Sequence, residues 1–471
     1  MTAIIGFLNT IFWGYVLIYG LLAVGAFFTV RLGFLQFRHF AEMFRCVMGS
    51  GATDRDGISP FQALTVSLAS RVGTGNIAGV AVALYLGGPG AIFWMWMVAL
   101  VGMATAYAES TLAQLYKTHG AEGGIYRGGP AFYISRGLGL PWLGAIFSVC
   151  LIISFGLVFN AVQANSIADA FAGAFGLPKL ATGLLVAVLT GVVIFGGVRQ
   201  IARVAEIVVP FMAGVYLLLA IVVLVMNIGA VPGVLGQIFA SAFGFGAAAG
   251  GFAGGIAAAA LNGIKRGLFS NEAGMGSAPN IAATASPAPH HPSSQGFVQS
   301  LGVFIDTLLV CTATAVMILL SGVLDPTNGV TGTALTQAAL THHFGSFGAI
   351  FVAVAIFFFA FTSIIGNYAY CESAMEFLGL GHKGALTGLR GLVLIMVIWG
   401  ALQAVATVFD FADASMGLMA TINLIAIVAL SGVVAALTRD YLAQRKAGQE
   451  PRFHIAEHPG LARGVEPEIW K

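Results

Sequence analysis

The sequence predicts an all-α polytopic membrane protein with eleven transmembrane helices, and three observations lead to this fold class. The 471 residues are 58% hydrophobic and only 8% charged, whereas soluble domains carry about 25% charged residues. Apolar stretches that approach or exceed the ~20 residues needed to cross a bilayer recur along the whole chain. Two of these stretches are interrupted by glycines, which is typical of helices that are broken within the membrane.

The apolar stretches define the predicted helices in order. We place the spans at residues 11–31, 60–85, 90–116, 141–175, 180–197, 204–227, 233–268, 296–322, 346–368, 387–408 and 414–437. The first span is followed by charged residues, beginning at Arg31, and so does not resemble a cleaved signal peptide. We expect residues 1–440 to form a single transmembrane domain and the polar residues 441–471 to form a loosely ordered cytoplasmic tail.

The lysine and arginine residues test this topology. All 21 of them except Lys179 and Arg71 fall on one side if the eleven spans alternate in direction. The positive-inside rule then places the N-terminus outside and the C-terminus in the cytoplasm. We therefore expect a multi-pass protein of the plasma membrane, which in a bacterium is the inner membrane. Lys265 and Arg266 are counted here in the cytoplasmic connection after the seventh span.

The second span contains the most informative stretch of the chain. Its centre reads Arg71-Val72-Gly73-Thr74-Gly75-Asn76, although an arginine at that depth costs roughly 2.5–3.5 kcal/mol. Glycines alone would also suit a close helix-packing seam, but that alternative leaves the polar residues unexplained. We predict a break at which free backbone groups line a watery cavity, as in the midplane binding sites of secondary transporters.

The seventh span is the second interrupted one. Residues 233–268 would extend for roughly 50 Å as one helix, and the segment from Phe243 to Gly255 is rich in glycine. We predict two half-helices around this segment; a long tilted helix with small packing residues is the alternative. Because the two interrupted spans are five apart, spans 2–6 and 7–11 are predicted to form a five-plus-five inverted repeat, with the first helix added in front.

The ends of a broken helix predict the chemistry of the site. The free N–H groups at the start of the second half, from Thr74 to Asn76, suit a carboxylate. The free carbonyls at the end of the first half, Ala69 and Val72, suit Na⁺ or an ammonium group. The break is therefore suited to a zwitterion together with a small hard cation.

Other polar side chains at membrane depth extend this prediction. Thr362 and Ser363 offer two hydroxyls in an apolar helix, and hard cations prefer oxygen ligands; bonding to a carbonyl of the preceding turn is the alternative. Asp306 lies deep in span 8, where it could ligate a cation or pair with Arg71. Gln163 could contact the substrate or join neighbouring helices.

The remaining reactive residues predict little further chemistry. The four cysteines have no paired spacing, so they indicate neither a disulfide framework nor a metal site. Glu109, late in span 3, is expected to be structural. We expect no cofactor, no transition metal and no nucleic-acid partner. The expected partners are the lipid bilayer, the amino-acid substrate and Na⁺ as the coupling ion. The oligomeric state is left open.

Four motifs resemble the alanine or glycine:cation symporter family. They are VGTGNIAGVA at 72–81, GGPGAIFWMWMVALVG at 87–102, RGLFSNEAGMGSAPNIAATA at 266–285 and FTSIIGNYAY at 361–370. The similarity extends from the first to the last span. It implies the inverted-repeat fold of the leucine transporter with one extra helix, and import of small neutral amino acids driven by Na⁺ or, in some members, by H⁺.

The resemblance also implies roles for single residues. Thr74 and Gly75 would donate backbone N–H groups to the substrate carboxylate, and Gln163 would contact the substrate. Thr362 and Ser363 would bind Na⁺ with the carbonyls of Ala69 and Val72. Glu272 would support an inner gate. The predicted substrate site further includes Phe243, Gly251 and Asn367, and the predicted sodium site further includes Asn76 and Asp306.

These observations favour one function over three alternatives. The preferred function is Na⁺-coupled symport of alanine or glycine by alternating access. Some alanine-selective relatives have a bulky aromatic residue where this chain has Asn367, and Arg71 could reach a larger polar side chain, so a Na⁺- or H⁺-coupled glutamine symporter is the runner-up. A passive channel is the alternative from another class. An enzyme is not expected, because the spans contain no nucleophile and base pair.

Overall fold

Apolar helices dominate the structure. The computed structural model describes residues 2–49, 56–120, 124–244 and 252–471. Within these ranges, eight helices are long and apolar enough to cross a membrane: Ile5–Arg31, Gly90–Leu115, Pro141–Phe175, Gly197–Met226, Pro292–Ser321, Ser346–Phe377, Lys383–Leu402 and Val405–Ala429. Shorter apolar helices cover Gly75–Gly87, Lys179–Ile194 and Val231–Ala242. The chain is therefore a multi-pass membrane protein, while eleven spans and an inverted repeat stay predictions.

The elements follow one another as helices, π-helical turns (η1, η2, η4, η5), 3₁₀ turns (η6, η7) and one short hairpin. In chain order they are α1 (Thr2–Ile11), η1 (Phe12–Val16), α2 (Leu17–Arg31), α3 (Leu35–Arg38), α4 (Phe40–Met48), α5 (Pro60–Arg71), η2 (Gly75–Gly79), α6 (Val80–Gly87), α7 (Gly90–Leu115), β1 (Thr118–Gly120), β2 (Gly124–Arg127), α8 (Pro130–Gly137), α9 (Pro141–Leu151), η4 (Ile152–Phe159), α10 (Asn160–Phe175), α11 (Lys179–Ile194), α12 (Gly197–Met226), α13 (Val231–Ala242), α14 (Phe252–Asn271), α15 (Pro279–Ala282), α16 (Pro292–Val303), η5 (Phe304–Cys311), α17 (Thr312–Ser321), α18 (Gly332–Phe344), α19 (Ser346–Phe377), α20 (Lys383–Leu402), α21 (Val405–Ala429), α22 (Ser431–Lys446), η6 (Ile455–Glu457) and η7 (Pro459–Leu461). Strands β1 and β2 pair antiparallel.

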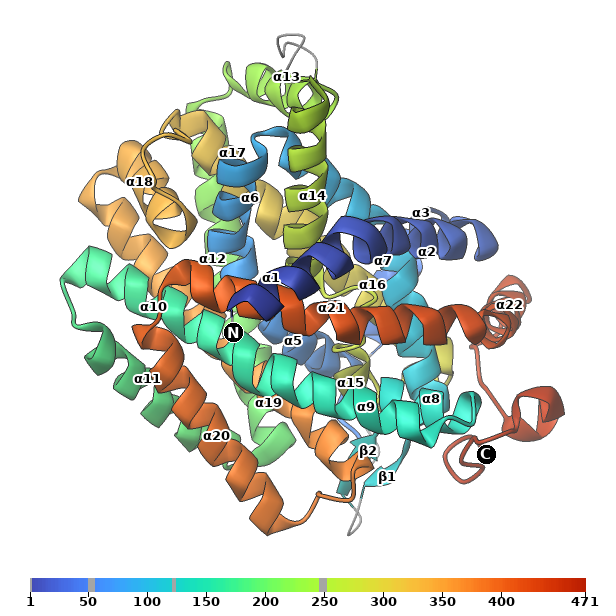
Figure 1. Cartoon of the computed structure of the whole chain (residues 1–471). Helices are drawn as coiled ribbons and strands as arrows, with labels where there is room; N and C mark the ends of the chain where they lie inside the picture. Colours follow the sequence, from blue (N-terminus) through green and yellow to red (C-terminus); the bar gives the residue numbers. More distant parts are fainter. Residues whose placement is uncertain (1, 50–55, 121–123, 245–251) are drawn as a thin grey trace.

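Helix α7 defines two ends of the molecule. A side chain at its first residue, Gly90, would collide with the backbone of Ala242, so the end of α13 packs directly on this glycine. Its last residue, Leu115, accepts a hydrogen bond from Trp470 Nε1 at 3.2 Å. These two contacts are separated by 26 residues, or about 39 Å of helix. We call the end with α13 and α18 the α18 end, and the end with the hairpin and the C-terminal residues the tail end (Figure 1).

The first predicted break is present. Helix α5 begins with a capping box between Ser59 and Gln62, with Pro60 at its first position, an arrangement that satisfies free backbone donors. It ends at Arg71, because Val72 leaves the helical region with φ −79° and ψ 81°. The chain becomes helical again at Gly75 and continues through η2 and α6, so the second half starts where the sequence predicted.

The glycine-rich segment of the seventh span is flanked by two helices, as predicted, and a further break that was not predicted follows the second of them. The expected single span 233–268 is divided between α13 and α14, two separate helices, and α14 continues to Asn271. The chain then leaves the helix with φ of 57° at Glu272, 85° at Gly274 and 83° at Gly276 before α15 begins. Positive φ is readily adopted by glycine and rarely by other residues, so this stretch, which we call the second break, ends α14 inside the protein.

This correction changes the positions of two charges. Lys265 and Arg266 lie within α14 and not in a connection between spans. Helix α14 runs beside α6, with α7 packed against it (Figure 1). The two basic residues therefore stand inside the helical bundle, where they need partners because an unpaired charge is costly there.

The C-terminal residues are packed, which contradicts the expected loose tail. Phe453 and Trp470 are fully buried. The Phe453 N–H donates to the carbonyl of His290 at 3.0 Å, and the Ile455 N–H donates to the carbonyl of Trp470 at 2.9 Å. The sequence is polar on average, but two aromatic side chains are enough to fix the segment against the tail end, since each buries a large apolar area.

Candidate functional site

The first break is bound by a glutamine from α10. The backbone N–H and the hydroxyl of Thr74 both donate to Gln163 Oε1, each at 3.0 Å. Both residues are buried. The amide oxygen of Gln163 therefore occupies the position that the sequence analysis gave to a substrate carboxylate. Both donors of Thr74 point toward one oxygen atom at this position.

Two glycines allow other helices to approach the break. A Cβ on Gly73 would lie 2.3 Å from Ser363 Oγ and 2.8 Å from Gln163 Oε1. A Cβ on Gly75 would lie 3.0 Å from the ring of Phe269. Real Cβ contacts this short do not occur without movement of a neighbour, so both positions require glycine for close packing.

The two hydroxyls of α19 lie next to the end of α5. Ser363 Oγ donates to the carbonyl of Ala69 at 2.8 Å and is also 2.9 Å from the carbonyl of Phe359. Thr362 Oγ1 donates to the same Phe359 carbonyl at 3.0 Å. Bonding within the helix is thus present for both residues, but Ser363 also joins the predicted carbonyl of the broken helix. Val72, the next predicted ligand, is buried at the end of α5.

Asn76 and Asp306 are brought together in a second polar cluster. Asn76 Nδ2 donates to Asp306 Oδ1. Ser270 Oγ donates to Asp306 Oδ2 at 2.9 Å, and Thr307 Oγ1 donates to the same oxygen at 2.6 Å. The cluster is buried and links η2, α14 and η5. The sequence analysis missed Ser270 and Thr307, although both are hydroxyl residues beside a predicted break or ligand.

A third set of contacts lies one turn away from Gln163 and Ser363 along their helices. Asn367 Nδ2 donates to Asn160 Oδ1 at 2.9 Å, and Ser70 Oγ is 2.5 Å from Asn367 Oδ1. Ser70 Oγ is also 2.9 Å from Glu272 Oε1. Since Ser70 belongs to α5 and Glu272 to the second break, this hydroxyl connects the two breaks. Asn367 therefore lies in a buried polar contact beside the first break, and its role in substrate binding stays a prediction.

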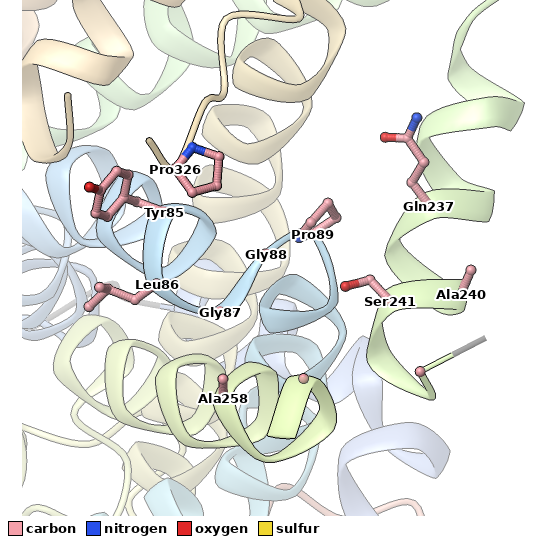
Figure 2. Close-up of a pocket in the computed structure, with 12 residues that line it drawn as sticks. Tyr85, Leu86, Gly87, Gly88, Pro89, Gln237, Ala240, Ser241, Ala258 and Pro326 are labelled. Carbon is pink, nitrogen blue, oxygen red and sulfur yellow. The ribbon is translucent and has the colours of Figure 1, made fainter. Parts of the chain in front are cut away.

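One predicted site residue, Phe243, is not part of this arrangement. Phe243 is 41% exposed, and its ring centroid lies 4.9 Å from that of Phe93 at the start of α7. It follows α13, which borders a cavity of about 610 Å³ with the turn at Gly88 and Pro89 (Figure 2). That turn ends α6, roughly 20 Å of helix away from Thr74. Gly251 lies outside the described residues.

The aromatic residue that does reach the break is Phe269. Its ring stacks on Phe159 with centroids 4.7 Å apart, and it also lies 5.5 Å from the ring of Phe409. Phe269 stands two residues before the end of α14. We call Phe159, Phe269 and Phe409 the aromatic layer, because they cover the break on its α18 side. The signal in the sequence was the motif 266–285, which contains this phenylalanine.

Comparison with known proteins decides the family. A sequence model described as the sodium:alanine symporter family matches residues 1–455. The amino-acid carrier protein AlsT of Bacillus subtilis is 50% identical over 459 residues, which cover 98% of this chain and 95% of that protein. The chain belongs to the sodium:alanine symporter family.

Other members have more specific names. The probable sodium/glutamine symporter GlnT of Bacillus subtilis is 48% identical, with 97% of this chain and 95% of that protein covered. The sodium/alanine symporter AgcS of Methanococcus maripaludis is 41% identical, with coverage of 94% and 98%. As a member of this symporter family, the chain is a membrane transporter and not an enzyme.

A solved structure is similar in fold alone. The manganese transporter of Eremococcus coleocola aligns with a TM-score of 0.51 at 15% sequence identity, over 80% of this chain and 78% of that one. At this identity the likeness carries no information on the substrate.

On the tail side of the break, the symporter has a network of buried polar groups. Glu109 of α7 accepts from the Gly274 N–H at 3.2 Å and from Asn423 Nδ2 at 2.7 Å. Asn423 Nδ2 also donates to the carbonyl of Gly274 at 3.0 Å. Ser277 Oγ donates to Glu272 Oε2 at 2.5 Å. We call these five residues the polar network, which fixes the second break to α7 and α21. Glu109 thus joins α7 to the second break and to α21, and a purely structural role for it stays a prediction.

Arg71, at the end of α5, is bound by a neighbouring helix. Its Nη1 donates to the carbonyl of Gln299 at 3.2 Å, and a side chain on Gly302 would come within 2.5 Å of the same nitrogen. Both partners lie on α16. The charge at the end of α5 thus interacts with a neighbouring helix, and it does not pair directly with Asp306.

Proposed function

We propose that this symporter takes up alanine or glycine together with Na⁺ across the plasma membrane. The observation that carries the proposal is the pair of donors on Thr74, which hold an amide oxygen at the start of a half-helix. A carboxylate is a stronger acceptor for such donors, because it is charged and the helix N-terminus favours negative charge. In this proposal, Gln163 moves aside or turns its amide nitrogen toward the bound amino acid.

The sodium site is proposed at the end of the first half-helix. Ser363 Oγ already lies 2.8 Å from the carbonyl of Ala69, and Thr362 and the carbonyl of Val72 complete a set of oxygen ligands. When Na⁺ enters, the Ser363 hydroxyl would turn its proton away and offer its lone pairs to the ion. The cluster of Asn76, Asp306 and Ser270 is a second place where oxygen ligands converge, and its carboxylate would add the charge that a cation favours.

The polar wall formed by Asn160 and Asn367 favours glutamine as the alternative substrate. These two amides lie one helical turn from Gln163 and Ser363, so they would face the side chain of a longer amino acid bound at Thr74. The pair satisfies itself at 2.9 Å, and a glutamine side-chain amide could insert into this contact with both a donor and an acceptor. A similar protein, GlnT, carries glutamine in its name.

The orientation in the membrane is part of the proposal. With Lys265 and Arg266 inside α14, the remaining connections at the tail end still contain most of the basic residues. By the positive-inside rule the tail end faces the cytoplasm, and the N-terminus lies outside. We propose eleven spans in the five-plus-five arrangement, with residues 441–471 as a packed cytoplasmic segment.

Uptake into proteoliposomes tests the function. Labelled alanine, glycine, serine and glutamine would each be offered under an inward gradient of Na⁺, Li⁺ or protons. Accumulation of alanine above its external concentration with Na⁺ alone supports the proposal. Accumulation of glutamine in preference to alanine would select the alternative. Equilibration without accumulation under every gradient would identify a passive channel and contradict symport.

A matched pair of variants tests the ion site. Ser363→Ala removes a proposed Na⁺ ligand, so the Na⁺ concentration for half-maximal uptake should rise about tenfold, which corresponds to ~1.4 kcal/mol. Thr421→Ala is the control, because Thr421 Oγ1 donates only to the carbonyl of the preceding turn, Gly417, at 2.8 Å. An unchanged Na⁺ dependence in Ser363→Ala, with weaker alanine binding, would move Ser363 from the ion site to the substrate site.

A further inference from the structure

A small cavity lies on the α18 side of the aromatic layer. It has a volume of about 260 Å³ and opens between α6, α14, α21 and the residue before α18. This is less than the ~300–1,000 Å³ that is typical of pockets for drug-sized ligands, so it suits a small molecule. Its walls combine apolar and charged side chains: Val82, Tyr85, Leu86, Asn262, Lys265, Arg266, Thr331, Val405, Ala406, Phe409, Asp410 and Asp413.

The charged side chains of this cavity are incompletely paired. Asp413 Oδ2 contacts Lys265 Nζ at 2.6 Å and Arg266 Nη2 at 2.5 Å. Arg266 and Asp413 are only 3% and 1% exposed. Nevertheless, Arg266 Nε and Nη1, Asp413 Oδ1 and Thr331 Oγ1 have no hydrogen-bond partner within the part of the chain that the structure describes. Buried polar atoms of this kind are normally satisfied by water or by a ligand.

The charge balance indicates the class of ligand. Lys265 and Arg266 are matched by Asp410 and Asp413, so the lining carries no net charge. A simple anion or cation would leave one charge of the cavity in excess. A zwitterion brings one group for each sign, a carboxylate for the free donors of Arg266 and an ammonium group for Asp413 and Asp410. Val82, Leu86 and Val405 provide an apolar wall for a neutral side chain.

The position of the cavity connects it to the break. The guanidinium carbon of Arg266 lies 5.6 Å from the ring centroid of Phe269 and 5.2 Å from that of Phe409. These rings belong to the aromatic layer, and Phe269 also packs on Gly75. The cavity and the Thr74 donors therefore lie on opposite faces of one layer of rings, and a ligand that entered from the α18 end would meet Arg266 before it met Thr74.

We propose that this cavity is a second binding site for the zwitterionic amino acid, occupied before the substrate passes the aromatic layer. The proposal rests on the proposed function for the identity of the ligand. The carboxylate binds Arg266 and the ammonium group binds Asp413 and Asp410. Binding also competes with the ion pair between Arg266 and Asp413, which holds Arg266 over Phe269, so occupancy of the cavity loosens the ring that covers the break.

Protection of a cysteine from labelling tests this site in the full chain. Ala406→Cys places a thiol at the mouth of the cavity, and a membrane-impermeant thiol reagent would be applied with and without alanine. The same cysteine would be studied together with Gly73→Ala, which disables the Thr74 site. Alanine should slow labelling at least threefold in both backgrounds. Ala230→Cys, exposed at the same end, is the control and should show no protection, and the chain without added cysteines gives the background.

The outcomes separate the two proposals. If protection disappears with Gly73→Ala, the chain has a single site and the second site is overturned, while the proposed function stands. If protection persists with Gly73→Ala but disappears with Asp410→Asn, a substitution at the exposed rim, the cavity binds the ammonium group as proposed. Protection by acetate or by methylammonium that equals the protection by alanine would show a simple ion site and overturn the assignment to a zwitterion. Protection without Na⁺-driven uptake would instead contradict the proposed function.

Discussion

The candidate site is closed toward the α18 end and toward the tail end in different ways. On the α18 side, three aromatic rings and the pair between Arg266 and Asp413 separate the Thr74 donors from a cavity. On the tail side, the polar network fixes the second break. Rings can rotate aside with few bonds broken, whereas the network loses several buried hydrogen bonds together. We infer that the α18 side is the easier one to open from this state, although the ion pairs of Asp413 with Lys265 and Arg266 must also rearrange there.

Further layers continue the closure at the tail end. Lys117 Nζ donates to the carbonyl of Ala285 at 2.9 Å, and Gln114 Nε2 donates to the same carbonyl at 3.0 Å. Beyond them, the buried Trp470 bonds to Leu115. Opening toward the tail end therefore requires movement of the chain after the second break relative to α7. A transporter that alternates between two sides needs this larger change only after both ligands have bound.

The largest effect is expected between the two closures, at Gly73, where the proposed substrate and sodium sites meet. Gly73→Ala places a methyl group 2.3 Å from Ser363 Oγ and 2.8 Å from Gln163 Oε1. Relief requires Ser363 to leave the Ala69 carbonyl and Gln163 to leave Thr74, so the two proposed sites are disrupted together. Because the methyl group takes up space in which both ligands are proposed to bind, alanine binding should weaken about 10- to 100-fold, which corresponds to ~1.4–2.7 kcal/mol.

Titration calorimetry of the purified protein checks this prediction. Gly214→Ala is the matched control, since a Cβ at Gly214, also within a membrane helix, meets nothing within 4 Å. Wild-type affinity in Gly73→Ala would mean that the substrate does not bind at this break.

An intermediate effect is expected in the polar network. Glu109→Gln retains one acceptor but turns an NH₂ group toward either Gly274 N or Asn423 Nδ2, both of which are donors. A hydrogen bond to a charged group contributes about 1.5–3 kcal/mol, but Asn423 still bonds to the Gly274 carbonyl. We expect backbone amides in residues 272–285 to exchange hydrogen about tenfold faster, and uptake to fall less than in Gly73→Ala.

Hydrogen–deuterium exchange measured by mass spectrometry provides this comparison. The control is Glu206→Gln, which alters a carboxylate of α12 that accepts from Gln62 Nε2 at 2.8 Å, away from the second break. If exchange increased on the α18 side of α14 and not in 272–285, the assignment of Glu109 to the tail-side closure would be wrong.

The two breaks also show what could be read from the sequence. The first was predictable because glycines and polar residues coincide in an otherwise apolar span, and Thr74, Asn76 and Ser363 do lie at or next to the break, while their binding roles stay predictions. The second prediction, one 36-residue span interrupted near Phe243, is correct in that α13 and α14 flank this segment, but it treats the two helices as halves of one span. In the structure, α13 instead packs on Gly90 as a separate helix, and left-handed backbone at Glu272, Gly274 and Gly276 ends α14.

The contacts within the site were harder to predict from the sequence than the residues that form it. Gln163, Asn367 and Asp306 were recognisable as polar groups at membrane depth. The hydrogen-bond partner of Gln163, Thr74, is 89 residues away in the sequence, and Ser70, a partner of Asn367, is 297 residues away. Pairing over such separations depends on how the helices cross. Hydropathy fixes which segments are helical but not which faces meet, so the bonds of Ser70 with Asn367 and Glu272 could not be predicted from one sequence.

The smallest effect on transport is expected at the outermost layer of the tail end. Trp470→Ala removes a buried ring that donates to Leu115, lies 5.2 Å from Lys117 Nζ and packs 5.7 Å from the ring of Phe453. Loss of a buried tryptophan costs about 3–5 kcal/mol, but this cost falls on the attachment of residues 447–471. Because the polar network is intact, uptake of alanine should stay within about threefold of wild type, while limited proteolysis should cut the chain near Arg452 much faster. Glu468→Ala, exposed in the same segment, is the control. If Trp470→Ala reduced uptake as strongly as Gly73→Ala, the C-terminal segment would itself be part of the closure. The contacts of Trp470 at the surface of the tail end, and not those of the second break, would then keep this side closed.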